Sequence, residues 1–248
     1  MKKKNFLFLL FIVAIGISIY SCNVGGKGNI TTYPPVVAVV DYDIKMGGTT
    51  IGTIYGYFAT PSLLSYDKGD CIYIQQFTVD SDNQPSDKYY TATGIYGVDA
   101  INQSYVEVNN TIELGTSTIL FSQADGLSHV CFNGKLFTAA SCKDKSPRYR
   151  LVYNSSEEEP NGLKNLYLLA GPSPETSSTD FGTLHAFDVL YLIQNYGRDT
   201  TVAVTGSSEK SVELKYIDVQ LNYLSEISET SEPVFKQAGT PFQIFIYK

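Results

Sequence analysis

The chain has 248 residues, of which 25 are acidic and 18 are basic, so its formal net charge is −7. This acidic balance argues against nucleic acid and anionic lipid surfaces as binding partners, because both attract clustered positive charge. Only 17% of the residues are charged, tryptophan is absent and tyrosine occurs 19 times. A composition rich in tyrosine, threonine and valine is typical of β-strands.

Residues 1–22 form a predicted lipoprotein signal peptide. Lysines at positions 2–4 precede an apolar run over residues 6–20, and Ser21-Cys22 follows, which is the order of a secretory signal. The segment Ile19-Tyr20-Ser21-Cys22 resembles the lipobox of bacterial lipoproteins, where cleavage before the cysteine leaves it as the lipidated N-terminus. We therefore predict lipidation of Cys22. The alternatives are a signal peptide that is cleaved elsewhere and an anchor that is not cleaved.

Lipidation of Cys22 predicts where the protein resides. Each buried methylene group contributes about 0.8 kcal/mol, so several acyl chains hold a protein on a membrane without a transmembrane helix. We expect a lipid-anchored protein of the cell envelope, at the outer membrane, and the sequence leaves open whether it faces the periplasm or the cell surface. Removal of residues 1–21 takes away three lysines and no acidic residue, which lowers the net charge to −10.

The mature chain begins with a predicted flexible tether over residues 23–35, which is rich in glycine and ends in two prolines. Short segments of alternating or continuous apolar residues follow, and they predict strands. Met46-Gly47-Gly48 is predicted as a hairpin turn, and the polar segment 80–87 as a solvated turn. The first predicted strands cover residues 36–44, 49–60, 71–79 and 89–101.

The same rhythm continues after residue 104. The later predicted strands cover residues 105–108, 117–122, 129–132, 135–139, 149–154, 163–170, 200–205, 216–224 and 242–247. The segment 216–224 alternates most regularly, which predicts one buried and one solvated face, as in antiparallel sheets. Residues 181–196 fit either a helix or a strand. We favour a strand, because a helix places Asp188 within its apolar stripe.

Many short strands with frequent turn signals predict an all-β fold. A looser zone near residues 102–116 divides the chain into a small β-barrel domain, residues 36–103, and an antiparallel β-sandwich domain, residues 104–248. The alternative is a single large β-sandwich.

Three stretches carry a family resemblance beyond the lipobox. They are Lys68-Gly-Asp-Cys-Ile-Tyr-Ile, the segment from Asp82 to Thr93, and the strand that begins at Tyr216. Together with the lipobox, they make the chain similar to Bacteroidales outer-membrane lipoproteins of the NigD-like kind. This resemblance implies an OB-like N-terminal β-barrel followed by a C-terminal β-sandwich. It implies no catalytic residues and no cofactor.

Three cysteines remain once Cys22 is assigned to lipid. Cys131 and Cys142 flank a predicted turn, so a disulfide across it is possible in an oxidising envelope, with two unpaired thiols as the alternative. Such a bridge contributes roughly 3 kcal/mol by loop-entropy reasoning. Cys71 lies in an apolar strand and is expected to pack as a small apolar side chain.

The sequence predicts no catalytic residue, no metal site and no cofactor. The Gly-x-Ser-x-Gly pentapeptide of serine hydrolases is absent, and adjacent Ser128 and His129 point to opposite faces of a strand. His129 and His185 are the only histidines, without a His-Glu-x-x-His motif, so no zinc site is indicated. We expect a protein without enzymatic activity, although 25 acidic residues leave a glycosidase pair of carboxylates open.

Two kinds of binding function fit this sequence. The first is an interaction or accessory module that works within an envelope protein complex. The alternative is carbohydrate binding through exposed tyrosine rings, which combine an apolar face with a polar tip. The candidate ligand platforms are Tyr55 with Tyr57, Tyr89 with Tyr90, and Tyr149 with Tyr153.

Overall fold

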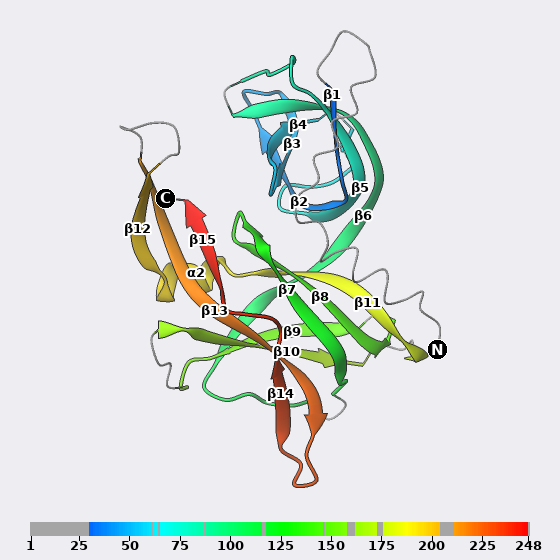
Figure 1. The fold of residues 1–248 in the computed structure, drawn as a ribbon, viewed down its shortest axis with the longest axis vertical. Coiled ribbons are helices and arrows are strands. Elements are labelled where there is room, and N and C mark those ends of the chain that lie inside the picture. Colours follow the sequence, from blue (N-terminus) through cyan, green and yellow to red (C-terminus); the bar gives the residue numbers. More distant parts are fainter. Residues whose placement is uncertain are drawn as a thin grey trace. The chain divides into compact units, whose positions relative to one another are not determined.

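The structure, a computed structural model, describes residues 30–60, 62–63, 65–86, 88–115, 118–145, 147–157, 162–172, 176–203 and 211–247. Cys22, the signal peptide and most of the predicted tether lie outside the described residues. Almost every element is a β-strand, so the predicted all-β class is confirmed (Figure 1). Among the described residues, no helix has the length and apolar character needed to cross a bilayer.

The chain divides into two compact units, residues 1–101 and 102–248, and the boundary falls within one long strand, β6. Each unit is described separately below. The first unit contains β1 (Ile30–Tyr33), β2 (Val36–Asp43), β3 (Gly48–Thr53), β4 (Gly56–Ala59), β5 (Cys71–Asp80) and the first part of β6 (Tyr89–Asn109).

The strands of the first unit pair in a closed circuit. β2 pairs with β3, β3 with β4, β4 with β6, β6 with β5, and β5 returns to β2. Only the β4–β6 pair is parallel. A closed circuit of five strands is the arrangement of small OB-type barrels, whose interior is filled by side chains. Its core residues include Val40, Ile51, Phe58, Ile72, Ile74 and Phe77.

The predicted tether is wrong at its C-terminal end, because residues 30–33 form strand β1. This strand adds to β5, with Ile30 opposite Asp80 and Tyr33 opposite Phe77. The rings of Tyr33 and Phe77 stack at a centroid distance of 4.7 Å. The burial of Tyr33 against the barrel core therefore orders a segment that composition alone suggested was flexible.

In the part of the second unit that the structure describes, the end of β6, nine further strands and the helix α2 form two layers. Its elements are β7 (Phe121–Phe132), β8 (Lys135–Asp144), β9 (Arg148–Asn154), β10 (Lys164–Gly171), β11 (Thr176–Asp188), α2 (Leu190–Tyr196), β12 (Arg198–Ala203), β13 (Ser211–Ile227), β14 (Pro233–Gln237) and β15 (Phe242–Tyr247). One layer has the order β6-β11-β8-β7. The other has the order β6-β9-β10-β13, and β12, β14 and β15 also pair with β13.

Apolar side chains of both layers meet in the main core of this unit. Leu136 and Phe187 come from the first layer, and Leu151, Leu168 and Val219 from the second; all five are fully buried. The layers are not purely antiparallel as predicted, since β6 runs parallel to β9 and β11, and β10 runs parallel to β13. Side-chain alternation has the same period in both kinds of sheet, so it does not reveal strand direction.

Residues 181–196 are both a strand and a helix, so the prediction of a strand is wrong for the last seven residues. Strand β11 ends at Asp188 and α2 begins at Leu190. The Asp188 carboxylate accepts the backbone N–H of Leu190 at 3.0 Å and the ammonium of Lys135 at 3.0 Å. Asp188 thus fixes the change of direction, and it lies before the apolar stripe of the helix, not within it.

Candidate functional site

The six tyrosines proposed from sequence lie in different environments. Tyr89, Tyr149 and Tyr153 are buried, at 4%, 7% and 2% exposure, and Tyr55 and Tyr57 are partly buried. Only Tyr90 is clearly exposed, at 39%. Tyr149 and Tyr153 are therefore wrong as surface platforms, because their strand β9 turns both rings into the core between the layers.

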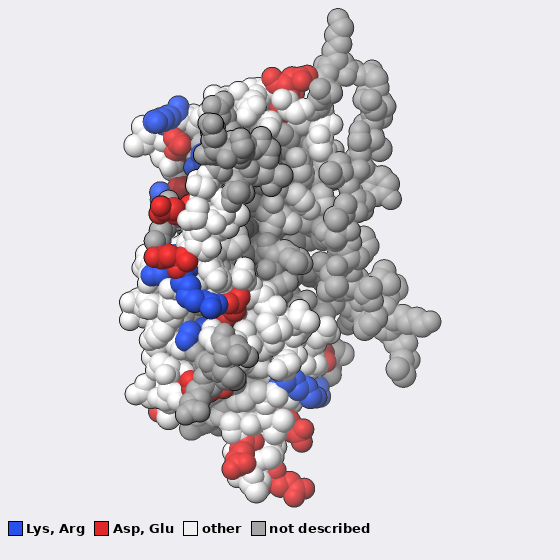
Figure 2. Space-filling view, turned by 60° about the vertical axis from the view of Figure 1, so that its left-hand side comes forward, with Lys and Arg blue, Asp and Glu red and all other residues white. Residues whose placement is uncertain are grey.

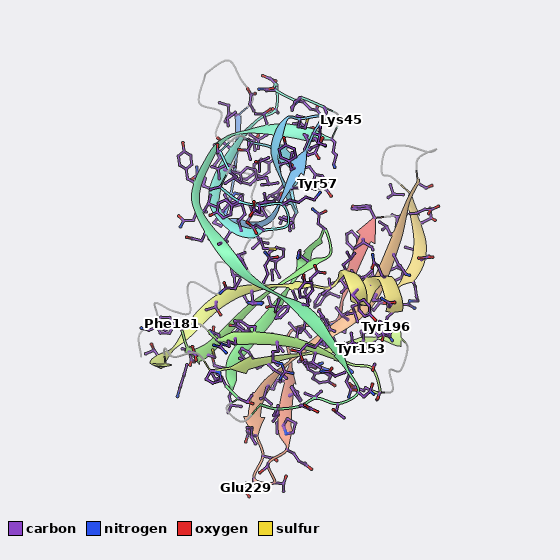
Figure 3. The ribbon with its side chains drawn as sticks, turned by 180° about the vertical axis from the view of Figure 1, so that it is seen from behind. Lys45, Tyr57, Tyr153, Phe181, Tyr196 and Glu229 are labelled. Atoms are coloured by element: carbon purple, nitrogen blue, oxygen red, sulfur yellow. The ribbon has the colours of Figure 1, made fainter. Side chains whose placement is uncertain are left out.

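The buried pair of the second unit is held by its neighbours. The Tyr149 hydroxyl is hydrogen-bonded to the Thr183 hydroxyl, and burial raises the pKa of Tyr149 far above its usual range. Tyr153 packs edge to face against Tyr196 of α2, with ring centroids 5.0 Å apart (Figure 3). Both rings therefore serve packing.

In the first unit, the structure brings Tyr57 and Tyr89 together around a lysine. We call Asp43, Tyr57, Lys88 and Tyr89 the Lys88 cluster. The Lys88 Nζ atom lies 4.8 Å from the centroid of the Tyr57 ring and 4.9 Å from that of Tyr89. The two rings are nearly perpendicular, at 78°, with centroids 6.2 Å apart. An ammonium group over two tyrosine faces is a double cation–π contact.

Local backbone structure positions each member of the Lys88 cluster. The parallel β4–β6 pairing sets Tyr57 directly opposite Tyr89. The backbone N–H of Tyr89 donates to the Ser86 carbonyl at 3.2 Å, which closes the turn before β6. Asp43 ends β2 and accepts the backbone N–H of Lys45 at 2.8 Å, an Asx-type turn that opens the β2–β3 connection.

Hydrogen bonds link the charges of the cluster through the Tyr89 hydroxyl. Its bond with the lysine ammonium raises the pKa of Lys88. The backbone N–H of Lys45, followed by the Tyr89 hydroxyl, lowers the pKa of the Asp43 carboxyl. The cluster therefore holds one ammonium and one carboxylate, both ionised near neutral pH, on either side of a phenol.

The cluster occupies the part of the barrel where OB-type domains bind ligands, namely the central strands and the two loops that flank them. Asp43 begins the β2–β3 loop, Lys88 ends the β5–β6 loop and Tyr57 lies on β4 between them. A cation, a carboxylate and aromatic faces suit a polar ligand with an apolar side. They do not form a nucleophile with a base.

His185 is the one described histidine side chain, and it is paired with a serine. Its Nε2 atom lies 2.9 Å from the Ser104 hydroxyl oxygen, which is the separation of a nucleophile and a base. The ring packs against Tyr149 and Phe187, at centroid distances of 5.0 and 4.6 Å. Burial lowers the pKa of His185 to about 4, so the imidazole is neutral and only weakly basic at neutral pH. The side chain of His129 lies outside the described residues.

Of the two alternatives for Cys131 and Cys142, the structure agrees with unpaired thiols, because Cys142 is a free, buried cysteine. The hairpin turn sets Cys131 opposite Leu136, and Cys142 lies opposite Phe121. Six residues further along a strand correspond to about 20 Å, far beyond the Cα separation of a disulfide. Cys71 is buried in the barrel core region, as expected for a small apolar side chain.

No group of three or more His, Cys, Asp or Glu side chains is arranged to hold a metal ion within the part of the chain that the structure describes. Charged side chains of both signs lie close together in the view of Figure 2, and uncharged residues form most of that surface. At the tip of the β13–β14 hairpin, near Glu229, the charged residues in view are acidic (Figures 2 and 3).

No protein-family model matches the chain, and no curated protein matches it. Solved structures resemble it over most of its length. A protein from Bacteroides fragilis described as a lipoprotein is 12% identical, with coverage of 86% of this chain and 97% of that one and a TM-score of 0.51. A protein of unknown function from Bacteroides vulgatus is 11% identical, with coverage of 86% and 92% and a TM-score of 0.53.

A NigD-like immunity protein from Bacteroides caccae is also similar, with 12% identity, coverage of 88% of this chain and 98% of that one, and a TM-score of 0.48. The similarities to the B. fragilis and B. vulgatus proteins establish a shared fold. Identities this low carry no residue roles from one chain to another. The chemistry of the Lys88 cluster therefore has to be argued from this chain alone.

Sequence reasoning missed Asp43 and Lys88. Both stand at strand ends next to turn residues, where a charged side chain usually signals only solvent exposure. The adjacency of Lys88 and Tyr89 only weakly indicated a contact between their side chains, because neighbouring residues on a strand point to opposite faces. The contact forms because Lys88 still lies in the turn, before the strand begins at Tyr89.

Proposed function

We propose that this chain is a lipid-anchored protein of the outer membrane that acts as a non-catalytic binding module. The lipobox supports attachment through Cys22. The fold shared with a B. fragilis protein described as a lipoprotein, and the resemblance to NigD-like lipoproteins, support a place in the cell envelope. The partner is another component of that envelope, bound through the first unit.

The observation that carries this proposal is the Lys88 cluster. Lys88 and Tyr57 are 31 residues apart in sequence, yet the Lys88 Nζ atom lies 4.8 Å from the centroid of the Tyr57 ring. The Tyr89 hydroxyl raises the pKa of Lys88, so the ammonium stays charged at neutral pH. An ordered cation beside aromatic faces, on loops carried by a rigid barrel, is a typical recognition surface.

The anchor is tested by detergent phase partitioning of the full-length protein expressed in a Bacteroides host. Wild type is expected in the detergent phase with the membrane fraction, and Cys22→Ala in the aqueous phase or held as unprocessed precursor. A Cys22→Ala protein that is processed and still partitions with detergent contradicts lipid anchoring.

The binding role is tested with the mature chain immobilised through its N-terminus and exposed to detergent-solubilised envelope of its own bacterium. We expect a component that wild type retains and that Lys88→Ala and Tyr57→Ala each retain at least about tenfold less, a loss of about 1.4 kcal/mol. The matched control is Lys236→Ala, which removes an exposed lysine of the second unit. Equal retention by all four chains contradicts a role for the cluster.

Carbohydrate binding through the six predicted tyrosines is not supported by this geometry. A stacking platform needs several rings that present their faces to solvent. Three of the six are buried, and Tyr57 already faces Lys88. Tyr90 alone does not make a platform.

A further inference from the structure

A row of aromatic and polar side chains covers the outer face of the second unit, where β12, β13 and β15 lie side by side (Figure 1). Pairing sets Arg198 and Phe245 on either side of Tyr216, and Thr200 and Tyr247 on either side of Leu214. Asp218 lies opposite Gln243 in the next row. We call this surface the β13 platform; its side chains are Arg198, Tyr216, Asp218, Gln243, Phe245 and Tyr247.

Alternation along β13 shows that this face is outward. Ile217 and Val219, which lie between the platform residues, are buried in the core, as is Ile244 of β15. On the same inner side, the Lys215 ammonium donates to the Gln194 carbonyl of α2 at 2.6 Å. The platform residues therefore occupy the opposite, solvent-facing side of the same three strands.

The aromatic rings of the platform are accessible and close together. Tyr247 is 61% exposed, while Tyr216 and Phe245 are partly exposed. The rings of Phe245 and Tyr247 lie 5.8 Å apart and nearly perpendicular. The Arg198 guanidinium covers the Tyr216 ring, with Cζ 5.2 Å from its centroid. Tyr247 is thus the platform ring that exposes the most surface to a ligand.

The polar side chains beside these rings are held in a fixed arrangement. The Asp218 carboxylate accepts the Gln243 amide at 2.8 Å through one oxygen and pairs with Arg198 through the other. The Asp218 carboxylate, the Gln243 amide and the Arg198 guanidinium each have further donors or acceptors that no other platform group uses. Asp218 keeps 30% of its side chain exposed and Arg198 keeps 54%, so these groups are within reach of a bound molecule.

We propose that the β13 platform binds a neutral polysaccharide. A sugar ring has one face of C–H groups, which packs on an aromatic ring, and an edge of vicinal hydroxyls, which pairs with planar carboxylate, amide and guanidinium groups. The platform offers both kinds of contact side by side. Tyr247 is the ring that stacks on the sugar, and Asp218, Gln243 and the edge of Arg198 recognise its hydroxyls.

The charges of the platform favour a neutral ligand. Arg198 and Asp218 form an ion pair, so the platform has no net charge to attract an anionic or cationic chain. An interface with a protein usually has an apolar centre and a polar rim. Here Arg198 lies in the same row as Tyr216 and Phe245, and Asp218 and Gln243 form the next row on the same face. Polar groups directly beside the rings suit a molecule that is amphipathic over one ring width.

The test is affinity electrophoresis of the mature chain in gels that contain one polysaccharide each: soluble starch, mixed-linkage β-glucan, xylan, galactomannan or, as the acidic comparison, polygalacturonate. We expect retardation by at least one of the four neutral polymers. Tyr247→Ala and Gln243→Leu should each weaken it about tenfold or more, since a stacked ring or a buried hydrogen bond is lost. Polygalacturonate should not retard the chain.

Two matched controls separate the platform from other surfaces. Tyr42→Ala removes a tyrosine that is 53% exposed in the first unit, and Lys88→Ala disables the Lys88 cluster; both should bind as wild type does. Unchanged thermal melting shows that the variants fold. The proposal is overturned if none of the neutral polymers retards the wild type, or if Tyr247→Ala and Gln243→Leu bind normally. It is also overturned if the wild type is a dimer that Tyr247→Ala converts to a monomer.

Discussion

Acid should destabilise this protein through His185, and the size of the effect follows from its burial. The imidazole is 6% exposed, and its Nε2 atom lies 2.9 Å from the Ser104 hydroxyl oxygen. Burial lowers its pKa to about 4, whereas the unfolded chain titrates near the ordinary value of 6.5. Between these two values the unfolded chain binds a proton at this position and the folded chain does not. The free energy of unfolding must therefore fall as the pH is lowered through this range.

The magnitude can be worked from the two pKa values. One pKa unit corresponds to about 1.4 kcal/mol, so the full effect below pH 4 is about 3 kcal/mol. At pH 5 the loss from this group alone, relative to pH 8, is about 2 kcal/mol. That is a large share of the 5–15 kcal/mol by which typical domains are stable.

Urea unfolding at intervals from pH 8 to pH 4.5, followed by circular dichroism, measures this loss. Carboxylates also titrate toward the lower end of this pH range. The contribution of His185 is therefore taken from the difference in unfolding free energy between wild type and His185→Gln. Glutamine keeps a side-chain amide for Ser104 and has no titration in this range. We expect the variant to be less stable at pH 8 but to lose about 2 kcal/mol less between pH 8 and pH 5. Parallel curves for the two proteins refute the burial argument, as does a folded-state imidazole that titrates above pH 6 by NMR.

Two further predictions concern packing and cysteine chemistry. Gly197→Ala should destabilise the second unit by about 2 kcal/mol or more in urea unfolding, because a Cβ atom there would lie 2.3 Å from the Ile193 carbonyl oxygen. Gly115→Ala, where a Cβ atom would have no atom of the described residues within 4 Å, should change stability by less than about 0.5 kcal/mol. A chain that starts at residue 23 should show three thiols toward Ellman's reagent when unfolded without reductant, since Cys142 is free. One thiol instead of three would show that Cys131 and Cys142 are bridged.

The prediction of a single strand over residues 49–60 is wrong, because β3 ends at Thr53 and the chain turns back into β4 at Gly56. The other barrel strands were predictable because each is apolar and bounded by a turn with its own chemistry. The Met46-Gly47-Gly48 turn is an example, since Gly47 adopts a φ of 63°, which glycine reaches without strain. Strand β1 was not predictable by the same rule. Its four residues are followed by Pro34-Pro35, and its order comes from contact with β5, about 45 residues away. The residues around β1 alone therefore do not predict its pairing with β5.

The segment 181–196 shows how a single residue can mislead a periodicity argument. A continuous helix would indeed bury Asp188 in an apolar stripe, so rejecting it was sound. In the structure, the strand ends at Asp188. The Asp188 carboxylate accepts hydrogen bonds from the Leu190 backbone N–H and from the Lys135 ammonium. An aspartate between two apolar runs is thus better interpreted as a boundary than as an interior residue.

The alternation of apolar and polar residues along β13 predicts its buried face correctly but not all of its opposite face. The prediction that Ile217, Val219 and Leu221 share the buried face is confirmed. The prediction of a solvated opposite face is wrong in part, since Gln220 and Asn222 are 2% and 8% exposed. Both amides are covered and satisfied: Gln220 donates to the Leu221 and Gly239 carbonyls, and Asn222 to the Asn165 side chain and the Gln220 carbonyl.

The same alternation determines which residues the β13 platform contains. Because side chains change faces at every residue, a shift of β13 by one position would expose Ile217 and bury Tyr216 and Asp218. Burying Ile217 and Val219 fixes that register, so the core holds Tyr216 and Asp218 outward with Gln243 beside them. The platform nevertheless joins residues that are up to about 50 positions apart in sequence, from Arg198 to Tyr247. Counting tyrosines therefore pointed to the wrong rings: a stacking surface depends on which strands pair, and the residues that decide the pairing are the buried ones between the tyrosines.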